Sequence, residues 1–97
     1  MKQKISKGQI YALNKLINSL IKDEDRELRL YVISKILGRD IDSTKNLTFD
    51  DWELIRDRAY DDWWNNNWEP TESFKDTVSF WEDKYLKEVK GYQKLNI

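Results

Sequence analysis

Acidic side chains are the residues of this chain with the most capacity for chemistry. Between two amphipathic stretches, residues 40–51 place oxygen-bearing side chains at Asp40, Asp42, Thr44 and Asp51. These are the first, third, fifth and twelfth positions of a calcium loop of the EF-hand kind. The sixth position, where the sharp turn calls for glycine, is Lys45, and the twelfth is not the longer glutamate. The pattern therefore favours an ordinary capped loop between two helices over a calcium site.

A magnesium-dependent nuclease site is the second possibility. Its groups would be two pairs of adjacent aspartates with three further charged side chains, namely Asp50/Asp51, Asp61/Asp62, Glu69, Glu72 and Lys75. Adjacent residues of a helix point about 100° apart, so neither pair converges on one metal position. The chain has no His and no Cys, which excludes the common zinc sites and the Ser–His and Cys–His nucleophile pairs. Its three glycines are isolated, so no phosphate-binding loop is present. We therefore predict a protein that is not an enzyme, with no catalytic residue, no metal and no cofactor.

The spacing of apolar residues predicts an all-α fold, a small bundle of about four helices in a single domain spanning residues 1–97. Ser6 with Gln9, and Thr48 with Asp51, resemble N-terminal caps, Gly38 suits a C-terminal cap, and Asn65-Asn66-Asn67 before Pro70 marks a turn. No segment alternates as a strand does. The expected helices cover about residues 7–21, 24–37, 49–64 and 71–91.

Charge is strongly segregated along the chain. Residues 1–46 carry a net charge of +4 and residues 47–97 one of −5, against −1 for the whole chain. On the third expected helix, one ridge opposite the apolar stripe carries Asp50, Glu53, Asp57 and Asp61. Such a ridge repels a phosphate backbone and could attract the nucleic-acid groove of a protein. The alternative is a merely solvated helix face.

The chain has thirteen aromatic residues among 97, which is more than a small core requires. Some of them could therefore serve an interface. Tyr60 and Trp64 fall in the last five residues of the third expected helix and Trp68 lies beyond it, and we interpret the three as anchors for a partner. The alternative is that Trp64 and Trp68 cap the end of the bundle. Phe80, off the apolar stripe of the last helix, could mediate a homodimer or pack against the first helix.

Two stretches resemble a short helical module of tailed-phage early and recombination-region proteins. They are Ile5-Ser6-x-x-Gln9-Ile10 and Ser43-Thr44-Lys45-Asn46-Leu47-Thr48-Phe49-Asp50-Asp51-Trp52 with Ile55. The resemblance spans residues 5–57 and implies a phage or prophage origin. In combining a helical scaffold with an acidic aromatic surface, the chain is also similar, as a class, to small anti-defence inhibitors, including anti-CRISPR proteins.

The leading hypothesis is therefore a phage-type protein that binds and inhibits a host or defence protein in the host cytoplasm. The amphipathic N-terminus and the lack of a long apolar stretch argue against a signal peptide or membrane span. The alternative is a recombination or replication accessory that contacts nucleic acid through its basic N-terminal half, using Lys2, Lys4, Lys7 and Lys15.

Overall fold

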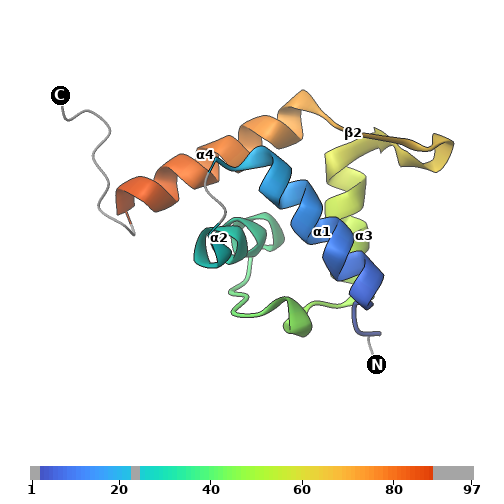
Figure 1. Ribbon diagram of the computed structural model, residues 1–97, viewed down its shortest axis with the longest axis horizontal. Helices are drawn as coiled ribbons and strands as arrows, with labels where there is room; N and C mark the ends of the chain where they lie inside the picture. Colours follow the sequence, from blue (N-terminus) through green and yellow to red (C-terminus); the bar gives the residue numbers. More distant parts are fainter. Residues whose placement is uncertain (1–2, 23–24, 89–97) are drawn as a thin grey trace.

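The computed structural model describes residues 3–22 and 25–88, and is mostly helical with one small antiparallel sheet (Figure 1). The helices are α1 (Lys7–Leu20), α2 (Arg26–Leu37), α3 (Phe49–Ala59) and α4 (Glu72–Glu88). Two single 3-10 turns, Thr44–Asn46 and Trp63–Asn65, and the strands β1 (Tyr60–Asp62) and β2 (Asn67–Pro70) complete the described elements. The ends expected at residues 24 and 89–91 lie outside the described residues.

Local capping determines where the helices begin. Ser6 Oγ accepts the Gln9 N–H of α1 while the Gln9 side chain accepts the Ser6 N–H, at 3.2 and 2.9 Å. Thr48 and Asp51 make the same reciprocal pair at α3. Each cap satisfies two backbone N–H groups that have no partner inside the helix. These predicted starts are therefore confirmed.

One continuous core joins the four helices. The largest fully buried side chains come from every helix and from the loop before α3, and they are Leu13, Ile17, Leu28, Val32, Ile33, Leu47, Ile55 and Val78. α4 runs along one edge of the molecule and contacts α1, α2 and α3, all of which lie on the same side of it (Figure 1). In the described part of the chain, no helix has the length and apolar character needed to cross a membrane.

The prediction that the third helix continues through residues 60–64 is wrong. The helix expected to reach residue 64 ends at Ala59, and the chain then forms a β-hairpin, although no strand was expected. Asp61 and Asp62 would have put negative charge in a helix's last turn, where the backbone dipole opposes it. In the hairpin, the Thr71 N–H donates to the Ala59 carbonyl at 2.8 Å, and Asn66 adopts a left-handed conformation at φ 64°. The turn predicted at the three asparagines is therefore confirmed, but it joins two strands.

Candidate protein-docking surface

The segment Tyr60–Pro70, hereafter the aromatic hairpin, projects from one end of the molecule beyond α3 and α4 (Figure 1). It carries Trp64 and Trp68, whose exposed fractions are 64% and 48%. Large aromatic side chains at this exposure leave substantial apolar area for a partner to bury.

Tyr60 does not share this exposure. It is only 8% exposed, and burial raises the pKa of its phenol. Its ring contacts the Trp68 ring edge-to-face at 5.1 Å between centroids. Tyr60 was predicted to be a surface anchor, but its side chain is buried and packs against the ring of the exposed Trp68.

The tryptophan rings support one another. Trp63, partly buried against the core, makes an edge-to-face contact with Trp64 at 5.8 Å and a tilted contact with Trp68 at 6.0 Å. The Trp63 Nε1–H donates to Asp57 Oδ1 at 3.0 Å, and the Trp68 Nε1–H donates to Asn66 Oδ1 at 3.1 Å. Each exposed ring therefore has at least one aromatic neighbour that limits its orientation.

Arg56 changes the expected acidic ridge. Its guanidinium lies 3.8 Å from the centroid of the Trp63 ring and forms ion pairs with Asp57 at 3.1 Å and Glu53 at 3.7 Å. Only 14% of the Arg56 side chain is exposed, so it is held between the ring and the two carboxylates. Two of the four predicted carboxylates are therefore paired with one positive charge of the same helix, which offsets part of their negative charge.

The other two predicted carboxylates are exposed but separated. Asp50 lies in the first turn of α3, whereas Asp61 lies on β1, beyond the end of the helix. Within residues 3–22 and 25–88, neither makes an ion pair. The four carboxylates thus do not form one helical ridge. On the hairpin itself, Asp61 and Glu69 are exposed and make no ion pair among the described residues.

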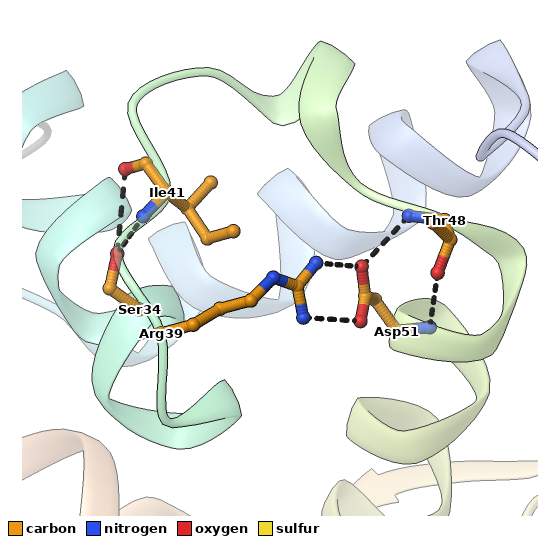
Figure 2. A network of polar contacts seen from close by, with 5 residues as sticks. All are labelled: Ser34, Arg39, Ile41, Thr48 and Asp51. Carbon is orange, nitrogen blue, oxygen red and sulfur yellow. Dashed lines mark hydrogen bonds and ion pairs between the residues drawn. The ribbon is translucent and has the colours of Figure 1, made fainter.

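Residues 40–51 are organised by internal contacts (Figure 2). Arg39 Nη1 and Nη2 donate to the two oxygens of Asp51, with Nη1–Oδ1 at 2.9 Å, and Asp51 also accepts the Thr48 N–H at 2.8 Å. These hydrogen bonds, with that of Arg39 the largest cause, lower the pKa of Asp51 to about 2. The carboxylate at the twelfth position of the calcium pattern therefore joins the end of α2 to the start of α3. No group of three or more metal-binding side chains occurs among the described residues.

Ser34 secures the other side of the same connection. Its Oγ accepts the Ile41 N–H at 2.9 Å (Figure 2). The same hydroxyl donates to the Leu30 carbonyl at 2.7 Å. Ile41 is buried, so this bond fixes the chain where it leaves α2. Together with the Arg39–Asp51 pair, it ties the connection between α2 and α3 to both helices.

A second charged surface lies on α1. Residues 3–22 contain no Asp or Glu, and Lys4, Lys7, Lys15 and Lys22 are exposed along them. Tyr11 is 66% exposed, and the Lys15 ammonium lies 5.6 Å from its ring centroid. Lys2, the remaining predicted contact, lies outside the described residues. The basic N-terminal surface is thus presented without a neighbouring carboxylate on its own helix.

Phe80 does not pack against α1. It is 56% exposed on α4 and touches Trp81 edge-to-face at 4.9 Å between centroids. Of the two alternatives that its position in the sequence left open, burial against the first helix is excluded.

Comparison with protein-family models, with curated proteins and with solved structures finds no match to this chain.

Proposed function

We propose that this chain is a non-enzymatic protein that binds and blocks a partner protein through the aromatic hairpin. The observation that carries the proposal is the pair of exposed indoles, Trp64 and Trp68, on a hairpin whose conformation is fixed by ring contacts and hydrogen bonds. Ordering flexible side chains costs affinity, and anchors that are already oriented avoid much of this cost.

Charge indicates the kind of surface that the hairpin would meet. From Ala59 to Phe74 the chain has no Lys or Arg, whereas Asp61, Asp62, Glu69 and Glu72 all fall in this span. Electrostatic complementarity raises association rates and selects partners of opposite charge. The favoured partner is therefore a protein with a basic groove, such as one that binds nucleic acid. With the resemblance to phage proteins, this supports inhibition of a host or defence protein in the host cytoplasm.

The test is affinity capture from a host lysate with the wild-type chain, Trp64→Ala/Trp68→Ala and Leu54→Ala. Leu54 is exposed on α3, outside the hairpin, and serves as the matched control. We expect one basic protein to be retained by the wild type and the control and lost by the double variant. Each single Trp→Ala change should weaken binding to that purified protein by roughly 30-fold, as expected for hot-spot aromatics. Capture of the same proteins by the double variant would exclude the hairpin as the docking surface.

Charge changes separate steering from anchoring in the same complex. Asp61→Lys should slow association and flatten its salt dependence, because Asp61 is exposed and unpaired among the described residues. Asp57→Asn should change the rate by less than half as much, because it removes one charge where Asp61→Lys changes two, and Arg56 offsets part of the Asp57 charge. Asn can still accept the Trp63 Nε1–H bond. Equal effects of the two variants would contradict this assignment.

A second candidate function rests on α1. Exposed lysines with an exposed Tyr11, on a stretch without carboxylates, suit contact with nucleic acid through phosphate neutralisation and base stacking. Fluorescence anisotropy with labelled single-stranded and duplex DNA tests it at low and moderate salt. This function requires binding that weakens steeply as salt rises and is lost in Lys15→Glu/Lys22→Glu. Absence of binding at low salt would eliminate it.

A further inference from the structure

Arg56 lies where α3 ends and the aromatic hairpin begins. It belongs to the last turn of α3, and its carbonyl accepts the N–H of Tyr60, the first residue of the hairpin. Its side chain is always charged, yet only 14% of it is exposed. Burying a charge is unfavourable unless the charge is paired and hydrogen-bonded. The contacts that hold this guanidinium connect α3 to the indoles of the hairpin.

A single carboxylate oxygen joins Arg56 to Trp63. Asp57 Oδ1 accepts the Arg56 Nε–H at 3.1 Å and the Trp63 Nε1–H at 3.0 Å. The guanidinium carbon lies 3.8 Å from the centroid of the Trp63 ring. The indole is therefore bound at its N–H and covered on its face. A flat guanidinium can cover the ring and donate to the carboxylate at the same time, whereas the compact ammonium of lysine has no planar face.

The two exposed indoles depend on Trp63 to different extents. Among the described residues, Trp63 is the only ring that Trp64 contacts, at 5.8 Å between centroids. Trp68 contacts Trp63 at 6.0 Å, but it also contacts Tyr60 at 5.1 Å. Its Nε1–H donates to Asn66 as well. A displaced Trp63 ring would therefore leave Trp64 without its aromatic neighbour, while Trp68 would keep two of its contacts.

We propose that Arg56 is a positioning residue of the docking surface, which holds Trp63 so that Trp63 orients Trp64 for the partner. Arg56 acts through the indole and not by contact with the partner. An indole that rotates freely has its binding orientation for only part of the time, and the apparent affinity falls in proportion to that fraction. The inference rests on the proposed function, because it concerns how the aromatic hairpin binds.

Arg56→Lys tests the proposal, because it keeps the positive charge and removes the planar group. Binding to the captured partner should weaken about fivefold to tenfold, which is less than the roughly 30-fold expected for loss of Trp64 itself. The salt dependence should not change, because the net charge is the same. Arg58→Lys is the matched control and should bind as the wild type does. Arg58 lies in the same helical turn, donates to the Ile36 carbonyl at 3.3 Å and contacts no ring among the described residues.

A double-mutant cycle separates positioning from a general effect on stability. If Arg56 acts through Trp64, Arg56→Lys should weaken binding by less than about twofold in a Trp64→Ala background. In a Trp68→Ala background it should keep nearly its full effect. A residue that only stabilises the fold would act equally in both backgrounds. Equal factors in the two backgrounds, or wild-type affinity of Arg56→Lys, would overturn the proposal.

Fluorine NMR of the chain labelled with fluorinated tryptophan gives a readout without a partner. The chain has five tryptophans, and single Trp→Phe changes assign their signals. In Arg56→Lys the Trp64 signal should move towards that of the free amino acid, and the Trp68 signal should move less. Arg58→Lys should leave both in place. An unchanged Trp64 signal in Arg56→Lys would refute the positioning role. Capture of the same proteins by Trp64→Ala/Trp68→Ala would instead refute the docking function, whatever the NMR result.

Discussion

Replacing Asp51 by Asn tests whether the Arg39–Asp51 ion pair stabilises the junction that supports the hairpin. Asp51 is 7% exposed, accepts two hydrogen bonds from Arg39 and one from the Thr48 N–H, and caps α3 (Figure 2). Asn keeps the size of the side chain and one acceptor for the Thr48 N–H. The variant therefore removes the ionised interaction with Arg39 while leaving most of the packing in place.

The expected magnitude follows from the pKa of Asp51. A decrease from 3.8 to about 2 on folding corresponds to about 2 kcal/mol of stability at pH 7. Because the pKa is lower in the folded state, this contribution is complete above pH 4 to 5 and is lost as the pH falls towards 2. By the same relation, about half of it remains at pH 3.

Urea denaturation followed by tryptophan fluorescence at pH 7 and pH 3 measures the effect. Asp51→Asn should lower the free energy of unfolding by about 2 kcal/mol at pH 7 and by about 1 kcal/mol at pH 3. Asp50→Asn is the matched control: it changes an exposed carboxylate of the same helical turn without an ion pair among the described residues, and should cost no more than about 0.5 kcal/mol. An Asp51→Asn loss that is equal at both pH values, or no larger than that of Asp50→Asn, would refute the assignment.

Two further changes test how the helices are joined. Gly38→Ala should lower the free energy of unfolding by about 1 kcal/mol in the same denaturation assay. Gly38 ends α2 at φ 78°, a left-handed conformation that is unfavourable for alanine. No atom lies within 4 Å of the added methyl, so this backbone cost is the whole effect. Glu82→Ala should cost about 2 kcal/mol and Glu82→Gln clearly less, because buried Glu82 accepts the Lys22 N–H at 2.7 Å beyond the end of α1, and Gln retains an acceptor there. Equal losses for both Glu82 variants would show that this hydrogen bond contributes little.

Helix starts were predictable because their chemistry is local. Ser6 with Gln9, and Thr48 with Asp51, are three residues apart and satisfy the backbone within a single turn. Gly38 likewise ends α2 through its own left-handed conformation. Such signals depend on a few neighbouring residues, so a single sequence contains them completely.

The hairpin was not predictable in this way because long-range contacts determine it. Trp63 continues the three-and-four spacing of α3, which favours a longer helix. Three interactions oppose that local preference and favour the hairpin. They are the Ala59–Thr71 backbone hydrogen bond, the burial of Tyr60, and ring contacts between residues up to eight positions apart. The sequence contained one signal against the longer helix: Asp61 and Asp62 would have placed negative charge near its C-terminus, which is unfavourable. Tertiary packing therefore ended α3 earlier than the apolar spacing predicts. For the same reason, the prediction that the four carboxylates share one helix is wrong.

Arg56 shows why exposure and charge have to be considered together at this surface. By pairing with Glu53 and Asp57 while stacking on Trp63, it offsets part of the negative charge of α3 and contacts the ring that packs against both exposed indoles. The carboxylates that remain free near the indoles lie on the hairpin itself, at Asp61 and Glu69. In the docking that we propose, electrostatic attraction and apolar burial would therefore act on the same few residues, and a basic partner attracted to the hairpin would contact Trp64 and Trp68 directly.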